Sequence, residues 1–211
     1  MTVGKEQRAE LTMFYEPKTG HGLPRNPFKA IVAPRPIGWI STRDAQGRDN
    51  LAPYSYFNAV NDSPPQVIFA GGDGKADRPL HKDSISNVLE TGVFCVNLVS
   101  LDLAEPMNLS SKALAAGEDE FAFAGLEKAP CQTIACARVA AAPAALECRL
   151  LQIIPLLGES HMVLGEVIGV HIRDEMIRDG RLDVLRYKPL SRLGYHDYAA
   201  VERTFEMRRP E

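Results

Sequence analysis

The alternation of apolar and polar positions between residues 37 and 70 predicts three short strands. Residues 37–42, IGWIST, alternate with a period of two, which is typical of a strand. A turn follows at residues 44–47, with glycine where a positive φ is convenient. The return segment Asn50–Asn58 contains Pro53, which cannot donate to a strand ladder and so indicates an edge or a bulge. Residues 66–70 continue as a third strand, and the tight turns predict an antiparallel meander.

After residue 70 the pattern adds helices. A helix is predicted from Asp83 or Ser84 to Gly92, because capping residues open it and a glycine closes it. A strand is predicted next over Val93–Val99, and then a helix over Leu101–Leu109. Two long strands follow at Leu146–Leu156 and His161–Arg173, and both are apolar enough to be covered on both faces. Many short strands with a few inserted helices predict a mainly β fold, a barrel with helical additions.

The first 30 residues carry glycines and prolines that interrupt regular structure. We expect a short helix at about Glu6–Tyr15 and then an extended arm that lies across the body of the protein. The chain shows no internal repeat, low-complexity tract or long Gly/Ser linker. The sequence therefore predicts a single domain over residues 1–211, with residues 1–30 as its N-terminal helix and arm.

Composition and charge narrow the classes of function. The chain has 211 residues, 45% hydrophobic and 24% charged, as in an ordinary globular domain. Its formal net charge is -3 and it has no Lys/Arg-rich block, which argues against nucleic acid and anionic membrane as partners. No apolar run approaches the ~18 residues of a membrane span, and no signal-peptide pattern opens the chain. We therefore expect a cytoplasmic protein.

Cysteine and histidine spacings give no metal motif. The histidines show no pairing at i, i+4, so no metal site is predicted, and His171 in its apolar strand is interpreted as a hydrogen-bonded structural residue. The cysteines, at spacings of 36, 5 and 12, match neither a zinc pair nor a dense disulfide framework. We expect reduced thiols in or near the core at Cys95, Cys131, Cys136 and Cys148.

Common nucleotide and hydrolase motifs are absent from the sequence. Neither G-x-G-x-x-G nor G-x-x-x-x-G-K-[ST] occurs, and the glycine-rich residues 71–74 fit neither spacing. No G-x-S-x-G nucleophile elbow is present, so a serine hydrolase has no support.

The predicted helix start is a candidate anion site. The first N–H groups of a helix are unpaired and carry partial positive charge. Lys75, Arg78 and Lys82 precede this helix, so a phosphate would fit there. Alternatively, Asp83 and Ser84 only cap the helix while Lys82 is solvated, and this stretch alone favours that interpretation.

Residues 34–58 are a second candidate region. Arg35 is held extended by Pro36, so Arg35, the backbone around Ile37 and the hydroxyls of Ser41 and Thr42 would line one edge. The return segment places the small residues Ala52 and Ser55 where a planar ligand can approach the backbone. The aromatic residues Tyr54, Tyr56 and Phe57 lie on either side of that position. Taken singly, these residues are explained by packing and turn formation, but their density indicates a flat ligand.

Several runs of this sequence resemble a known family. They are GLPRNPFKAIVAPRPIGWISTRDAQGRDNLAPYSYFNAVNDSPPQVIFAGG, HKDSISNVLETGVFCVNLVS, LECRLLQIIPL, HMVLGEVIGVHI and LSRLGYHDYAAVERTFEMRRP. The chain resembles the flavin reductase-like family of FMN-binding split β-barrels, which includes flavoredoxin and the reductase components of two-component flavin monooxygenases. The similarity runs from about Gly22 onward, and its most specific part is Pro34–Asn58.

The resemblance implies a homodimer that binds FMN close to the subunit interface, with NAD(P)H passing hydride to flavin N5. The family's ring-binding positions correspond here to Arg35, Pro36, Ile37, Trp39, Ser41, Thr42, Ala52, Pro53, Tyr54, Ser55, Phe57 and Asn58. The positions near the ribityl phosphate correspond to Lys82, Asp83 and Ser84, and the family's helix asparagine to Asn87. His161 corresponds to a histidine near the nicotinamide.

Hydride transfer to a flavin needs no protein acid or base with a strongly shifted pKa, because the flavin stores the electrons and solvent can protonate it. We therefore predict no catalytic triad, and the protein's part is to position ring and nicotinamide. The expected partners are the nicotinamide nucleotide and a flavin-dependent monooxygenase or electron-transfer protein. Two alternatives stay open: a flavoprotein reduced by a protein donor, and a flavin-binding protein without turnover.

Overall fold

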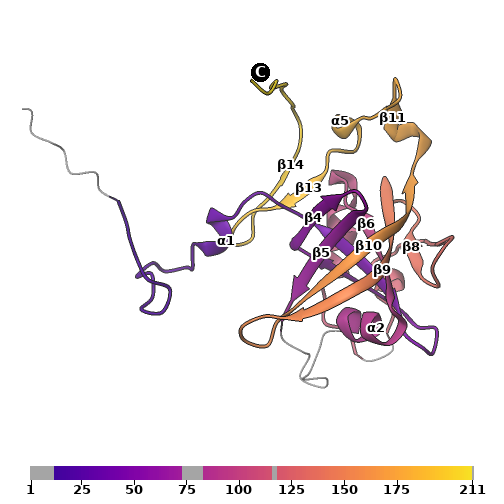
Figure 1. Cartoon of the computed structure of the whole chain (residues 1–211), viewed down its shortest axis with the longest axis horizontal. Coiled ribbons are helices and arrows are strands. Elements are labelled where there is room, and N and C mark those ends of the chain that lie inside the picture. The colour runs from indigo at the N-terminus through magenta and orange to yellow at the C-terminus, as the bar shows by residue number, and fades with distance from the viewer. Residues whose placement is uncertain (1–11, 73–82, 116–117, 211) are drawn as a thin grey trace, which may run out of the picture.

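The central sheet begins with the hairpin that the alternation predicts. The computed structural model describes residues 12–72, 83–115 and 118–210. Strands β2 (Gly38–Arg43) and β3 (Asp49–Tyr54) flank a turn in which Gly47 has a φ of +82°. Seven antiparallel strands follow the order β3-β2-β6-β9-β10-β5-β4 (Figure 1). The other five are β4 (Tyr56–Asp62), β5 (Pro65–Gly71), β6 (Val93–Leu98), β9 (Ala144–Pro155) and β10 (His161–Ile172).

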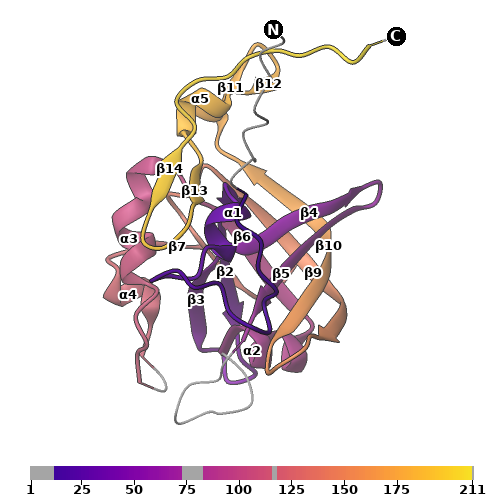
Figure 2. The same cartoon turned by 90° about the vertical axis from the view of Figure 1, so that its left-hand side faces the viewer.

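Only Ser55 separates β3 from β4, yet these two strands occupy opposite edges of the sheet. β3 pairs with β2 and β4 pairs with β5, so the predicted three-stranded meander is wrong and the segment forms two hairpins. The sheet curls until both edges meet the bend at Ser55 (Figure 1 and Figure 2). This geometry is a barrel open along one seam. It confirms the predicted fold class, a mainly β split barrel with helical additions.

The helices lie close to their predicted positions. Helix α2 (Asp83–Thr91) ends at Gly92, whose φ is +73°, and β6 follows at once. A 3-10 turn at Leu101–Leu103 and helix α3 (Ala104–Leu109) fill the predicted helix at 101–109. The remaining elements are short: α1 (Phe28–Ile31), α4 (Glu120–Phe123), α5 (Val184–Tyr187), a 3-10 turn at Asp174–Met176, β1 (Arg35–Pro36), β7 (Lys128–Pro130), β8 (Ala137–Val139), β11 (Ile177–Arg178), β12 (Arg181–Leu182), β13 (Leu190–Arg192) and β14 (Tyr198–Ala200).

The alternating side chains of β2 belong to two separate hydrophobic cores. Ile40 points into the barrel, where it joins a buried cluster that includes Phe69 and Phe94. Trp39 points to the other face, where α3, α4 and the β7–β8 hairpin cover a second cluster. The Trp39 indole donates a hydrogen bond of 2.9 Å to Ser110 Oγ. Both faces of β2 are therefore buried, which fixes its register strongly.

Strands β9 and β10 have the predicted positions, but they are not covered on both faces along their whole length. Their ends inside the barrel are buried, as at Cys148 and Val163. The side chains of Val170 and Ile172, which share one face because successive strand residues alternate, are 59% and 40% exposed, and Ile168, at the β-bulge between Val167 and Gly169, is 38% exposed. The long strands extend beyond the barrel, so the prediction of two covered faces fails at these ends.

The N-terminal segment differs from its prediction. Most of the expected helix, residues 6–11, falls outside the described residues, and residues 12–15 are not helical. Residues 12–27 extend away from the barrel rather than across it (Figure 1). Across the described ranges, no helix is both long and apolar enough to cross a membrane.

Candidate functional site

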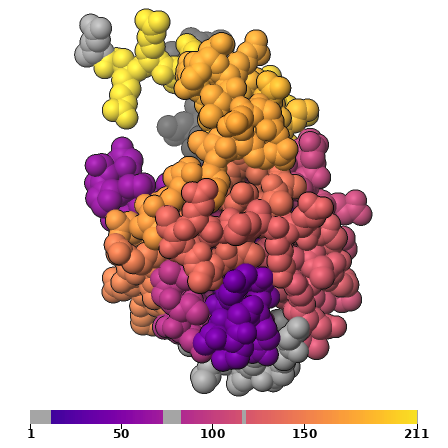
Figure 3. Space-filling view, turned by 90° about the vertical axis from the view of Figure 1, so that its right-hand side faces the viewer, coloured from indigo at the N-terminus to yellow at the C-terminus, as the bar shows by residue number. Residues whose placement is uncertain are grey.

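The exposed edge of β3 runs between two cavities. One, of about 230 Å³, lies at the start of α2 and beside the β2–β3 turn, and Asn50, Asp83 and Asn87 line it. The turn itself, dark purple in Figure 3, stands at the surface of the molecule. The other cavity, of about 390 Å³, is lined by Pro53 and Ser55 together with residues of the C-terminal segment. A ligand laid along β3 would therefore reach both.

Two predicted residues, Asp83 and Asn87, line the first cavity, and hydrogen bonds tie α2 to β2 and β3 beside it. Asn87 Nδ2 donates to Thr42 Oγ1 over 3.0 Å, which fastens α2 to β2. Asn50 Nδ2 donates to Ser84 Oγ over 2.9 Å. The phenol of Tyr54 is fully buried, and this burial raises the pKa of Tyr54 to about 12 against the opposing hydrogen bond with Ser84. Tyr54 therefore stays a neutral phenol, and β3 holds the first turn of α2 in place.

The described lining of this cavity carries Arg48 and six carboxylates: Asp44, Asp49, Asp83, Glu90, Glu118 and Glu120. Two of them are neutralised by salt bridges, Asp44 by Arg48 at 2.6 Å and Asp49 by Arg43 at 2.7 Å. An anion here would consequently need the amides of α2 and further cations. Lys82, the predicted cation, lies outside the described residues together with Lys75 and Arg78.

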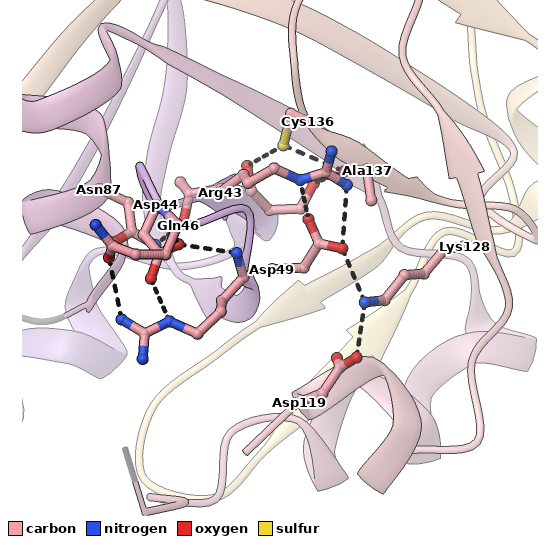
Figure 4. A network of polar contacts seen from close by, with 12 residues as sticks. Arg43, Asp44, Gln46, Asp49, Asn87, Asp119, Lys128, Cys136 and Ala137 are labelled. Carbon is pink, nitrogen blue, oxygen red and sulfur yellow. Dashed lines mark hydrogen bonds and ion pairs between the residues drawn. The ribbon is translucent and has the colours of Figure 1, made fainter. Parts of the chain in front are cut away.

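A chain of charges fixes the start of β3 (Figure 4). Asp49 accepts from Arg43 and, over 2.8 Å, from Lys128, and Lys128 in turn lies 2.6 Å from Asp119. Burial alone would raise the pKa of Asp49, but the hydrogen bonds from Arg43 and Lys128 outweigh it and lower that pKa. The chain of charges joins β2, β3 and β7 to the residue that caps α4.

The outer edge of β3 offers few backbone donors. The Leu51 N–H donates to Glu120 Oε2 over 3.2 Å, away from β2. Outward N–H groups recur at every second residue of an edge strand, so the next position is Pro53, which has none. Ser55, at the bend, is the first outward position after Leu51 that carries an N–H. Beyond Leu51 the edge therefore presents one amide, that of Ser55, beside the Pro53 and Ser55 side chains rather than a row of donors.

The second cavity is cationic. Lys29, Arg35, Arg192 and His196 line it with Pro53 and Ser55, and a further cavity of about 610 Å³ shares Arg192 and His196 with it. Arg35 is 6% exposed. Its guanidinium donates to the carbonyls of Lys29, Val32 and Leu193, the last at 2.6 Å. Arg35 thus joins α1 and the C-terminal segment to the barrel, and its contact with a cofactor stays a prediction.

The other predicted residues are spread over the barrel. Trp39 and Ser41 lie on the covered outer face, where Ser41 Oγ donates to Ala137 O over 2.6 Å. Phe57 packs in the inner core, while Asn58 is exposed. Pro36 and Ile37 belong to the seam beside β13, and Ala52 packs against the inner core. His161 opens β10 opposite Gly71, where the chain enters residues 73–82.

Sequence reasoning missed three buried polar residues. Asn97 is fully buried and donates to Trp39 O and Ser41 Oγ while accepting from Val139 N, so it joins β6, β2 and β8. Glu120 blocks the edge amide of Leu51. Glu147 is also fully buried. For Asn97 and Glu147 the available signal was a polar residue inside an apolar strand. The sequence analysis used the same signal to interpret His171 as a hydrogen-bonded structural residue. His171 Nε2 lies 2.5 Å from Glu147 Oε1, which confirms this hydrogen bond.

Comparison with known proteins identifies the family. Residues 32–198 match the family model described as flavin reductase like domain. An uncharacterized protein from Deinococcus radiodurans is 39% identical over 188 residues, which cover 85% of this chain and 82% of that protein. The structure of Pseudomonas fluorescens 2-nitrobenzoate 2-nitroreductase NbaA is 31% identical, with a TM-score of 0.77 over 87% of this chain and 88% of that one. Nitrilotriacetate monooxygenase component B from Bacillus cereus is 28% identical, with a TM-score of 0.85 over 94% of this chain and 100% of that one.

The matched region contains the whole seven-stranded sheet, α2 and the residues that join the two cavities. Its curled sheet, open at Ser55, agrees with the fold of the solved relatives. The chain belongs to the family of flavin reductase-like domains.

Proposed function

We propose that this protein is an NAD(P)H-dependent FMN reductase. The observation that carries the proposal is the β3 edge, which is open at Pro53 and Ser55 and reaches a cavity at each end. Membership of the flavin reductase-like family supports a flavin, and the choice of FMN rests on the proposed phosphate position at α2. A bound flavin would supply the two-electron chemistry by accepting hydride at N5.

The residues of the β3 edge fit a flat ring with a polar rim. Pro53 and Ser55 leave a partly exposed strip of backbone beside a cavity of about 390 Å³. The Ser55 amide would donate to the rim of the ring. The Tyr54 and Phe57 side chains are buried behind this strip of backbone, and their packing keeps the strip rigid. These residues bind and orient the ring, and positioning is what hydride transfer requires of the protein.

The phosphate would lie at the first turn of α2. Ser84 and Asn87 are already held there by Asn50 and Thr42, so the turn is preorganised. Asp83 faces the same cavity, and Lys82 precedes it in the chain. Lys82 and the first backbone amides of α2 would then supply the positive charge that the described lining lacks.

We further propose a homodimer and a flavin-accepting partner. The exposed residues Ile168, Val170 and Ile172 support the dimer, because exposed apolar side chains gathered on one strand favour a subunit contact. The monooxygenase component among the similar structures supports a flavin-dependent monooxygenase as the partner. His161, at the entrance to residues 73–82, is the proposed neighbour of the nicotinamide.

Anaerobic reduction tests the activity. The purified protein, mixed with FMN and NADH or NADPH without oxygen, should bleach the visible absorbance of the flavin faster than a protein-free mixture does. Bleaching at the protein-free rate with both nucleotides contradicts the proposal. Reduction by a ferredoxin-type donor alone would instead favour the flavoprotein that receives electrons from a protein.

Lys82→Ala should weaken FMN binding without unfolding the protein. Loss of one charge-assisted contact to the phosphate is expected to raise the Kd by about two- to thirtyfold, which corresponds to ~0.5–2 kcal/mol. Titration of FMN fluorescence measures this change. Lys18→Ala, which removes an exposed lysine of the N-terminal arm, is the matched control and should leave the Kd unchanged. An unaltered Kd in Lys82→Ala would remove Lys82 from the phosphate site.

A further inference from the structure

Three cysteine thiols gather beneath the β7–β8 hairpin, on the covered outer face of the sheet. Cys95 of β6 and Cys136 are buried with Ala145, and Cys131 packs against them from the rim. Cys131 is the one of these three that is partly exposed. Cys148 is buried in the inner core, on the opposite face of the sheet.

The hairpin places Cys131 directly opposite Cys136. Its register pairs Lys128 with Val139 and Pro130 with Ala137, so the next pair is Cys131 with Cys136. The Cys131 N–H donates to Cys136 O over 3.1 Å, while the Cys136 N–H donates to Ile134 O over 3.0 Å, so one of the two ladder bonds continues to this pair. Cα atoms of residues opposite each other in an antiparallel hairpin are about 4.5–5.5 Å apart, inside the roughly 4.4–6.8 Å range of disulfides. A disulfide would therefore need little movement of the backbone.

Their surroundings give the two thiols different characters. The Cys136 Sγ lies 3.3 Å from both Ser41 O and Ala137 O, which are the acceptors available to its single proton (Figure 4). The neighbouring thiols of Cys136 and then Cys95 lower the pKa of Cys131, against burial and the nearby charge of Glu147, which raise it. Hydrogen bonding to Cys131 and burial raise the pKa of Cys136. Cys131 is accordingly the nucleophile of the pair, because thiolates are the reactive form.

The loop that follows Cys131 is held in place by the Glu147 carboxylate. Glu147 accepts from the backbone N–H groups of Gln132 and Thr133, each over 2.6 Å. This fixes the residues that follow Cys131 and leaves its partly exposed thiol at the rim of the cluster. Among the residues that the structure describes, no group of histidine, cysteine, aspartate or glutamate is arranged to hold a metal ion. The cluster thus has the arrangement of a thiol redox pair.

We propose that Cys131 and Cys136 form a dithiol that hydroperoxides oxidise to a disulfide. The Cys131 thiolate attacks one oxygen of hydrogen peroxide, so an S–O bond forms, the O–O bond breaks, and the departing hydroxide takes up a proton to give water. The Cys136 sulfur then attacks the Cys131 sulfenic acid. An S–S bond forms, the S–O bond breaks, and the hydroxyl leaves as water with the Cys136 proton. The two thiols lose two electrons, and the peroxide is reduced to two molecules of water.

This reaction goes beyond flavin reduction and does not depend on it, because the oxidant is added hydroperoxide. Cys136 is the resolving partner rather than Cys95 for a geometric reason. Cys95 is held in the middle of β6 by ladder pairing on both sides, with Ser41 and with Glu147. Cys136 shares a hairpin with Cys131, so closing that pair displaces only a short surface loop.

Peptide mapping of the intact protein tests the proposal directly. The protein is reduced, desalted without oxygen, treated with stoichiometric hydrogen peroxide, alkylated and digested with trypsin. Cleavage after Lys128 and Arg138 puts Cys131 and Cys136 in one peptide, while Cys95 and Cys148 fall in others. We expect the peptide 129–138 to lose two hydrogen atoms and to escape alkylation. A cross-link between the peptides of Cys131 and Cys95, or full alkylation of Cys131, overturns the proposal.

Variants separate the two steps. Cys136→Ser should leave a Cys131 sulfenic acid that dimedone traps on the same peptide, and Cys148→Ala, the control in the inner core, should form the disulfide as the wild type does. Cys131 should react about tenfold or more faster than Cys148, because only Cys131 combines exposure with thiolate character. Equal rates for Cys131 and Cys148 contradict the assignment, and this comparison uses only the wild-type chain.

Discussion

Glu147→Gln is expected to lower the free energy of unfolding by about 3 kcal/mol, the largest effect of a single polar substitution that we predict. The Glu147 carboxylate is fully buried and accepts hydrogen bonds from Gln132 N, Thr133 N, Thr133 Oγ1 and His171 Nε2. A glutamine amide has the same shape but turns one acceptor into a donor. That NH2 group would then face N–H or O–H donors, which would remain buried without a partner.

The same residue predicts a dependence of stability on pH. Burial alone would raise the pKa of Glu147, but hydrogen bonds from Thr133, Gln132 and His171 outweigh it and lower that pKa to about 2. The carboxylate is thus favoured in the folded state. Its contribution to stability is fully present above the ordinary glutamate range, near pH 4.5, and is lost as the pH falls toward 2.

Urea unfolding at pH 7, 4 and 3 measures both effects. The gap between wild type and Glu147→Gln should be widest at pH 7 and should narrow at pH 3. Glu166→Gln is the matched control, since Glu166 forms a surface salt bridge of 2.7 Å with Arg149 and its loss should cost under ~1 kcal/mol. If the two variants lose equal stability at pH 7, Glu147 does not hold the hairpin loop.

Gly38→Ala is expected to destabilise the barrel by about 2 kcal/mol through overpacking. A Cβ at Gly38 would lie 2.6 Å from Phe57 Cδ2 and 2.7 Å from Phe57 Cγ, far inside normal contact. Phe57 belongs to the inner core and follows the bend at Ser55 by two residues. The clash would therefore push the start of β4 away from β2, and we expect FMN binding at the bend to weaken as well.

A double-mutant cycle isolates this contact. Phe57→Leu alone removes core contacts and destabilises, but it also clears the space that the new methyl group needs. We therefore expect Gly38→Ala with Phe57→Leu to cost at least ~1 kcal/mol less than the sum of the two single changes. Urea unfolding measures the stability of each variant, and FMN titration measures the site. Additive costs would show that Gly38 and Phe57 do not meet.

The site was predictable where its residues are neighbours in the chain. Ser84 was predicted because capping residues and a closing glycine mark α2 locally, whereas Asn87 was predicted from the resemblance to the family. The Ser55 region was found because Pro53 marks an edge. The hydrogen bonds that join Ser84 to Asn50 and Asn87 to Thr42 were not predictable, because they cross from one element to another. Arg35 shows the same limit, since its guanidinium reaches Leu193 O from 158 residues away in the chain.

Local patterns in the chain predicted the β2–β3 hairpin, the ends of α2 and the mainly β class, because alternation, turn residues and caps act over a few residues. The folded structure was needed to place β3 and β4 at opposite edges, since a strand's partner depends on the curl of the whole sheet. It alone also decided that Cys131 faces Cys136 and that Glu147 lies beneath their loop. Burial and pairing between distant segments leave no periodic trace in the chain, so the links within the candidate site and the thiol pair emerged only from the folded barrel.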